Sequence, residues 1–317
     1  MKFDVEKRTV LYTRHGSHAY GLNIATSDED FKGICVKPKE AYLGFCSSFE
    51  QKEHMGSKSD GVDSVIYSLD KFARLAADCN PSIIEILHVD QSCIVKQDEF
   101  GEELRSLKDE FISRKAKFTF MGYAEAQLKR IKTHRSWLLT PPTKEPERID
   151  FGLDDTSKIS ASELGAFVAA EQQLIESVIQ LPHHVLTIFT REKQYSSARQ
   201  HYSQYIGWMK SRNPARAELE AKFGYDTKHG MHLIRLMRMA NEILAIKKVV
   251  VKRPDRDELL AIRRGERSYD SLIEESEQLK AKCELLFETT SLPTDCNRIV
   301  LEKRIVSMVE RYLTKHG

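Results

Sequence analysis

The chain has 317 residues, of which 41% are hydrophobic and 30% charged, a composition typical of a globular protein with a hydrophobic core. It contains no run of about 18 apolar residues, and residues 1–6 carry acids without an apolar core. We therefore expect no membrane span, no secretory signal and a cytoplasmic protein. The six cysteines form no C-x-x-C pair, which argues against a zinc site, and the net charge of +2 by itself identifies no partner.

The first part of the chain has the pattern of a small sheet. β-Branched and aromatic residues predict strands at 8–15, 28–36 and 62–66, and the segment 39–61 is compatible with a strand or a loop. Helical periodicity begins after residue 66. Asn80 and Pro81 then supply an N-cap and a proline at the first helical position, which predicts another helix from that point.

The rest of the chain has mainly helical patterns, interrupted by a proline-containing loop at 140–157. These patterns cover about 100–137, 160–181, 193–221, 226–248, 268–288 and 296–315. The sequence therefore predicts an α+β protein, with a small α/β module over residues 1–95 and a larger all-helical region over residues 96–317.

Chemically informative residues are concentrated between positions 16 and 30. Gly16 and Ser17 follow the first predicted strand, where glycine allows close approach of a phosphate and the serine hydroxyl adds a donor. Asp28 and Asp30 alternate on the second predicted strand, so both carboxylates should project from one face. Glu29 should project from the opposite face and be exposed.

Two neighbouring carboxylates repel each other unless a cation lies between them. Oxygen ligands without a nearby His or Cys favour Mg²⁺ or Mn²⁺, and such ions can support phosphoryl transfer. Asp63, an acid in a short apolar strand, is the best third ligand, although Asp60 lies only three residues earlier. Each feature alone is weak, because an Asp-x-Asp pair is more often a solvated turn.

Together, these residues resemble the Gly-Ser, Asp-x-Asp and Asp signature of polymerase β-type nucleotidyltransferases. The finer pattern resembles one branch, the RNA repair pathway DNA polymerase β family. Three stretches carry the resemblance: GSHAYGL to SDEDFKGI at 16–34, DSVIYSLDKFARLAADCNPSIIEIL at 63–87, and KFGYDTKHGMHLIRLMRMANEIL at 222–244.

The resemblance implies that residues 1–95 form a polymerase β-like catalytic module, completed by the helical region. It further implies metal-dependent transfer of a nucleotidyl group from a nucleoside triphosphate (NTP), with release of pyrophosphate. Asp28 and Asp30 would hold both metal ions, and Asp63 would hold the catalytic ion and assist deprotonation of the acceptor hydroxyl. Gly16 and Ser17 would cradle the triphosphate.

The helix expected at 226–248 supplies further candidates. Lys228, His232 and Arg235 fall at i, i+4 and i+7 on one stripe, which could bind nucleotide phosphates or an RNA backbone. An ordinary surface stripe is the alternative, and the resemblance favours nucleotide binding. From Lys228 to Arg267 the chain has eleven Lys or Arg against five Asp or Glu, compatible with a basic surface or a solvated helix face.

Two more features leave their roles open. Glu85, on the helix after Pro81, could support the site or be merely exposed. Trp137, which follows several basic residues, could stack on nucleic acid or pack a helix end against the core.

Three functional hypotheses remain. The first is an enzyme that adds nucleotides to a hydroxyl of an RNA end. The second keeps the chemistry but uses a protein or small-molecule acceptor, which the near-neutral charge favours somewhat. The third is a nucleotide-binding module without catalysis, against which the three intact acids argue. The sequence does not reveal the preferred base or the oligomeric state.

Overall fold

The structure, a computed structural model, describes residues 3–46, 48–56, 62–154, 183–212 and 214–316. The helix expected at 160–181 and the alternative acid Asp60 lie outside these residues. The chain divides into two compact units: Met1–Ile131 with Tyr225–Gly317, and Lys132–Gly224. This contact-based division falls at different positions from the module boundary suggested after residue 95, which stays a prediction.

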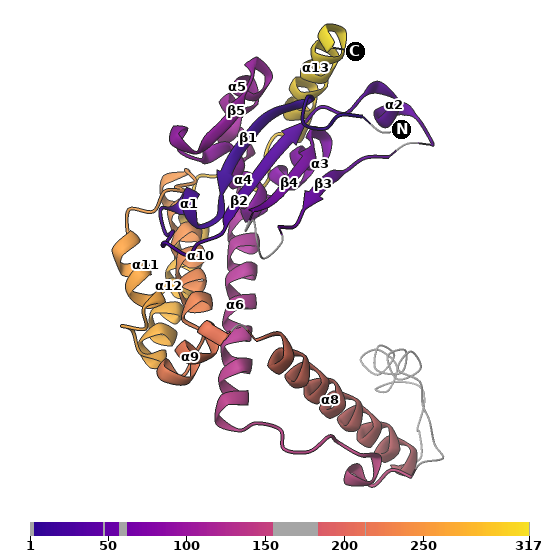
Figure 1. Cartoon of the computed structure of the whole chain (residues 1–317), viewed down its shortest axis with the longest axis vertical. Helices are drawn as coiled ribbons and strands as arrows, with labels where there is room; N and C mark the ends of the chain where they lie inside the picture. The colour runs from indigo at the N-terminus through magenta and orange to yellow at the C-terminus, as the bar shows by residue number, and fades with distance from the viewer. Residues whose placement is uncertain (1–2, 47, 57–61, 155–182, 213, 317) are drawn as a thin grey trace. The chain divides into compact units, whose positions relative to one another are not determined.

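The first unit contains a five-stranded mixed sheet in the order β3-β4-β2-β1-β5 (Figure 1). Its strands are β1 Thr9–His15, β2 Glu29–Cys35, β3 Gln51–His54, β4 Val62–Ser68 and β5 Ile94–Gln97. β2 and β4 are parallel, whereas the β1–β2, β1–β5 and β3–β4 pairs are antiparallel. The three strands expected at 8–15, 28–36 and 62–66 are all present. β5 was not expected, because its four residues are too few for a clear alternation.

Short helices connect and cover the strands. They are α1 Gly16–Tyr20, α2 Lys39–Leu43, α3 Leu69–Ala77, α4 Pro81–His88 and α5 Glu99–Ser106, with 3₁₀ turns at Gln91–Cys93 and Lys108–Phe111. α3 is amphipathic and buries Leu69, Phe72 and Ala76. α4 begins after Asn80 as expected, although the Asn80 amide donates to the Tyr123 hydroxyl (3.3 Å) instead of capping the helix.

The long helices of the first unit are α10 Thr227–Ile246, α12 Tyr269–Thr289 and α13 Arg298–His316, together with the short α11 Arg256–Arg263 and the N-terminal part of α6 Lys115–Leu139. α10 is capped by Asp226, whose carboxylate accepts a hydrogen bond from the His229 N–H at 3.0 Å. Its apolar stripe is fully buried: Leu233, Leu236, Met237, Ala240 and Leu244. A sheet followed by long helices confirms the α+β prediction.

The second unit contains the end of α6, a 3₁₀ turn at Arg148–Phe151, α8 His183–Ser211 and α9 Pro214–Phe223. Trp137 is buried there against His134, His201 and Trp208, and its indole N–H donates to His201 Nε2 at 2.7 Å. This contact corresponds to the packing alternative for Trp137.

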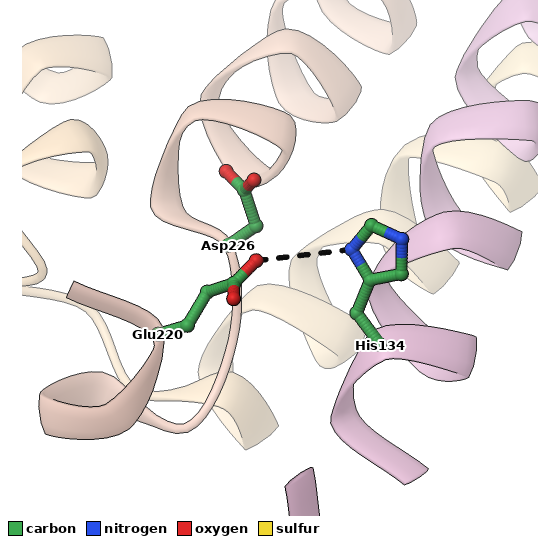
Figure 2. Close-up of side chains that lie close together, drawn as sticks. All are labelled: His134, Glu220 and Asp226. Carbon is green, nitrogen blue, oxygen red and sulfur yellow. Dashed lines mark ion pairs between the residues drawn. The ribbon is translucent and has the colours of Figure 1, made fainter. Parts of the chain in front are cut away.

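Buried charges in the second unit form ion pairs. Glu220 is 2% exposed and accepts hydrogen bonds from Arg212 at 2.6–2.8 Å. Figure 2 shows that His134 also points toward Glu220, and its Nδ1 lies 3.8 Å from Glu220 Oε1. Burial alone would raise the pKa of Glu220, but His134 and Arg212 outweigh that effect and lower it. None of the described helices is long and apolar enough to cross a membrane.

Candidate active site

A cavity of about 180 Å³ in the first unit gathers most of the predicted site residues. Its lining includes Gly16, Ser17, Asp28, Asp30, Lys228 and His232. Segments about 200 residues apart in sequence, the turn after β1 and the start of α10, therefore meet at one site. Tyr20, Leu22 and Met231 add an apolar wall.

The turn after β1 requires glycine. Gly16 has a φ of +59°, and a Cβ atom at this position would lie 1.9 Å from Oδ2 of Asp30. Backbone and carboxylate can be this close only because residue 16 has no side chain. Ser17 follows directly and lines the same cavity as Asp30.

The sheet aligns two of the three acids directly. In the parallel pairing of β2 and β4, Asp30 lies opposite Asp63, and Asp28 lies just before β2. Neighbouring residues in a parallel register project from the same face, so the two carboxylates lie beside each other. Burial, then the Asp63 charge, raises the pKa of Asp30, with Asp28 adding a smaller effect and Lys32 and Lys228 opposing it.

Asp63 differs from the other two acids in its surroundings. It is not among the residues lining the cavity, and its Oδ1 accepts a hydrogen bond from the Gly56 N–H at 2.8 Å. Glu29, between Asp28 and Asp30, forms an ion pair with Arg14 at 3.3 Å, and each of the two side chains is 42% exposed. The expected exposed position of Glu29 on the opposite face agrees with this contact.

The acid cluster, defined as Asp28, Asp30 and Asp63, suits a hard divalent cation. All its donors are carboxylate oxygens, and a cation between the carboxylates would relieve the repulsion that, after burial, raises the pKa of Asp30. Mg²⁺ and Mn²⁺ prefer such ligands. The chemistry of these donors therefore fits the metal ions that the resemblance implies, although the ligand atoms of the three acids do not all lie within 4.8 Å of one another.

The two outer members of the predicted stripe on α10 lie in different environments. Lys228 and His232 line the cavity, but Arg235 is 6% exposed and is not part of the lining. Its guanidinium carbon lies 3.7 Å from the centre of the Tyr20 ring, and its Nη1 lies 3.5 Å from Glu85 Oε1. Arg235 lies seven residues after Lys228 on the same face of α10, but it contacts the protein interior and not the cavity.

Burial, then the positive charges of Arg235 and Lys228, holds the pKa of His232 well below its usual value. His232 is therefore neutral at pH 7 and offers the cavity a hydrogen bond, not a charge. His229, its neighbour, is engaged elsewhere: its Nδ1 lies 2.7 Å from the Gln127 side-chain oxygen.

Glu85 belongs to the interior, not to the surface. It is 1% exposed, accepts a hydrogen bond from the Tyr20 hydroxyl and contacts Arg235. Lys32 is partly buried beside this group, and its amine donates to the Ser82 carbonyl at 2.7 Å. Burial lowers the pKa of Lys32 to about 8, although Glu85 and Asp30 oppose the change.

Sequence reasoning missed Arg263, which also lines the cavity. It ends α11, a helix of eight residues that the periodicity did not indicate. Its guanidinium donates to the Leu22 carbonyl at 3.2 Å, and its own carbonyl accepts from the Thr227 hydroxyl at 2.9 Å. The only available signal was the basic excess between residues 228 and 267.

Comparison with known proteins agrees with the resemblance in the first part of the chain. Residues 2–139 match the RNA repair pathway DNA polymerase beta family. An uncharacterized 38.9 kDa protein from the nrdC-mobD intergenic region of Enterobacteria phage T4 is 31% identical over 132 residues. That alignment covers 38% of this chain and 38% of the phage protein, so the similarity spans well under half of either. No solved structure matches.

The matched segment contains the whole sheet and all three acids, whereas the resembling stretch at 222–244 lies outside it. The family description denotes a polymerase β-like protein of RNA repair, which suggests a nucleotidyltransferase. Over residues 2–139, the chain thus matches the family that its motifs resemble, the RNA repair pathway DNA polymerase beta family.

Proposed function

We propose that the chain is a metal-dependent nucleotidyltransferase that transfers a nucleotidyl group from an NTP to a hydroxyl of an RNA end. The observation that carries this proposal is the register of β2 and β4, which sets Asp63 beside Asp30, while Asp30, Asp28 and Lys228 line one cavity. Gathering like charges is unfavourable, so a cation-dependent role explains their placement better than a structural one.

Each residue has a distinct part in this proposal. Ser17 and the backbone of the glycine turn hold the triphosphate, Lys228 offsets its negative charge, and neutral His232 donates a hydrogen bond. The acceptor oxygen attacks the α-phosphorus, the bond to the β-phosphate oxygen breaks, and pyrophosphate leaves. Asp63 assists removal of the acceptor proton. Divalent ions held by the acid cluster would neutralise phosphate charge and favour the ionised acceptor.

The direct test uses α-labelled NTPs, Mg²⁺ and total RNA. Asp30→Asn should reduce incorporation at least about 10³-fold, because the substitution removes a metal-binding charge. Glu29→Gln is the matched control, since it removes an acid one residue away on the opposite face. Equal incorporation by wild type and Asp30→Asn would refute the proposal, and a chelator should abolish incorporation by the wild type.

One observation favours a protein or small-molecule acceptor. Several cations of the basic segment are neutralised within the first unit: Arg238 by Asp255, Arg253 by Glu242 and Arg267 by Glu275. Less basic surface is then left for a polyanion. This alternative predicts label that migrates with protein or small molecules and resists ribonuclease, whereas label found only on RNA would exclude it.

A nucleotide-binding module without catalysis is the second alternative. It predicts nucleotide binding but no metal-dependent pyrophosphate release with any NTP in the presence of cell extract. Pyrophosphate release that depends on Asp30 would exclude it.

A further inference from the structure

Lys32 places a positive charge close enough to the acid cluster to act on Asp30. It follows Asp30 by two residues on β2, so both side chains project from the same face of the sheet. Its amine is fixed by the hydrogen bond to the Ser82 carbonyl, in the first turn of α4. A carbonyl is uncharged, so this bond orients the amine without neutralising it.

The nearest buried acid is already committed to other partners. Glu85 accepts a hydrogen bond from Tyr20 and contacts the guanidinium of Arg235, which balances its charge. The Lys32 charge acts on Glu85 and, to a smaller extent, on Asp30, where it opposes the repulsion from the other acids. With three carboxylates against Lys32 and Lys228, the formal charge of this group is −1 instead of −3.

We propose that Lys32 is a positioning residue that acts as a built-in counter-cation of the acid cluster. It holds the carboxylates together before any ion arrives, and it weakens their binding of free divalent ions. The ion and the NTP then bind cooperatively, because the negative charge of the phosphates adds to the attraction of the carboxylates for the ion. This inference rests on the proposed function for the identity of the site.

The affinities for a cation and for an anion should change in opposite directions, which separates this role from a merely structural one. Removing a positive charge several ångströms from the ligands should tighten binding of a cation and weaken binding of an anion, each by about 5–10-fold. Loss of fold or packing would weaken both.

The experiment uses the full chain at pH 7 and requires no turnover. Mn²⁺ binding to the nucleotide-free protein is followed by electron paramagnetic resonance of free Mn²⁺, and ATP binding in chelator is followed by calorimetry. Lys32→Met keeps the length of the side chain and removes its charge. We expect Mn²⁺ to bind about 5–10-fold more tightly and ATP about 5–10-fold more weakly, with both restored in Lys32→Arg.

Lys96→Met is the matched control, since the Lys96 amine also donates to a backbone carbonyl, that of Glu6 at 2.9 Å, but from β5 at the edge of the sheet. It should change neither affinity. Weaker or unchanged Mn²⁺ binding in folded Lys32→Met, or an equal change in Lys96→Met, would overturn the inference. If Lys32→Met does not fold, Lys32→Gln is measured in the same way.

An Asp30→Asn arm separates failure of this inference from failure of the proposed function. If Asp30→Asn binds Mn²⁺ as tightly as the wild type, the acid cluster is not the ion site and the inference is overturned. If the Lys32 effects appear but no nucleotide is transferred, the inference stands and the catalytic proposal fails.

Discussion

The acid cluster of the first unit and the ion pairs of the second unit place carboxylates in opposite surroundings. The first sets Asp30 beside Asp63, so that like charges face each other across two strands. The second pairs Glu220 with Arg212, as it pairs Glu192 with Arg148, within hydrogen-bonding distance. Closed ion pairs need no ligand, whereas neighbouring carboxylates leave electrostatic energy that a bound cation can recover.

Under the proposed function, this difference assigns the chemistry to the acid cluster of the first unit and a structural role to the second unit's ion pairs. A pair such as Arg212 and Glu220 contributes mainly because either partner alone would be an uncompensated buried charge. The acid cluster has the reverse property, since removing one member relieves repulsion. The predictions below test that contrast.

The largest effect is expected at Gly16. Gly16→Ala would place a Cβ atom 1.9 Å from the Asp30 carboxylate. The carboxylate or the turn must therefore move to restore a normal van der Waals distance. We expect nucleotidyl transfer to fall about 10³-fold, because displacement of about 1 Å at a reacting centre alone can cost 10²-fold. Gly21→Ala is the control: Gly21 has a similar φ of +69° but nothing within 4 Å of a Cβ. Similar activities of the two variants would show that the contact with Asp30 is unimportant.

The next effect concerns the second unit. Glu220→Ala should lower its free energy of unfolding by about 3 kcal/mol, because Arg212 is left without its partner. Glu218→Ala, an exposed acid on the same helix, should have little effect. Chemical denaturation measures both, and Mn²⁺ binding by the acid cluster should be unchanged in each. Altered Mn²⁺ binding in Glu220→Ala would show that the ion pair of the second unit influences the acid cluster, contrary to the separate roles proposed for the two units.

The pH dependence of stability should have opposite signs at Asp30 and Glu220. Burial and then Asp63 raise the pKa of Asp30 above 3.8, so its contribution falls as pH rises from 3.8 through the folded-state pKa. The pKa of Glu220 lies below 4.5 despite its burial, so its contribution is complete above pH 4.5 and is lost as pH falls through the folded-state pKa.

Metal-free Asp30→Asn should therefore melt at a higher temperature than the wild type at pH 7, and Glu220→Gln at a lower one. Thermal unfolding from pH 3 to pH 7 in chelator measures both. A lower melting temperature for Asp30→Asn at pH 7 would mean that the cluster is stabilising, contrary to the contrast between the units.

The smallest effect is expected at Glu29. Glu29→Gln breaks an ion pair with Arg14 whose members are each 42% exposed, and such pairs contribute about 0.5 kcal/mol. Denaturation in low and high salt measures it, and the difference from wild type should shrink in 1 M salt. A large loss of stability or of Mn²⁺ binding would mean that Glu29 belongs to the site.

Local sequence was sufficient for several parts of this protein. The spacing of Asp28 and Asp30 indicated two acids at one place, and both line the cavity although Asp28 lies just before β2; the apolar stripe of α10 identified its buried side. The α10 stripe repeats within one helix, so the backbone geometry of that helix fixes it. The sequence pattern did not predict the short elements α2, β5 and α11, because a few residues show too little periodicity.

Only the tertiary structure decided how these elements meet. The parallel pairing of β2 with β4 sets Asp63 beside Asp30, and the packing of α10 leaves Lys228 at the cavity while it buries Arg235 against Tyr20 and Glu85. The sequence by itself determined which side chains could take part in the proposed site, because residue type and local spacing are properties of the sequence. Their distances and burial depend on contacts between segments far apart in sequence, which no local pattern specifies.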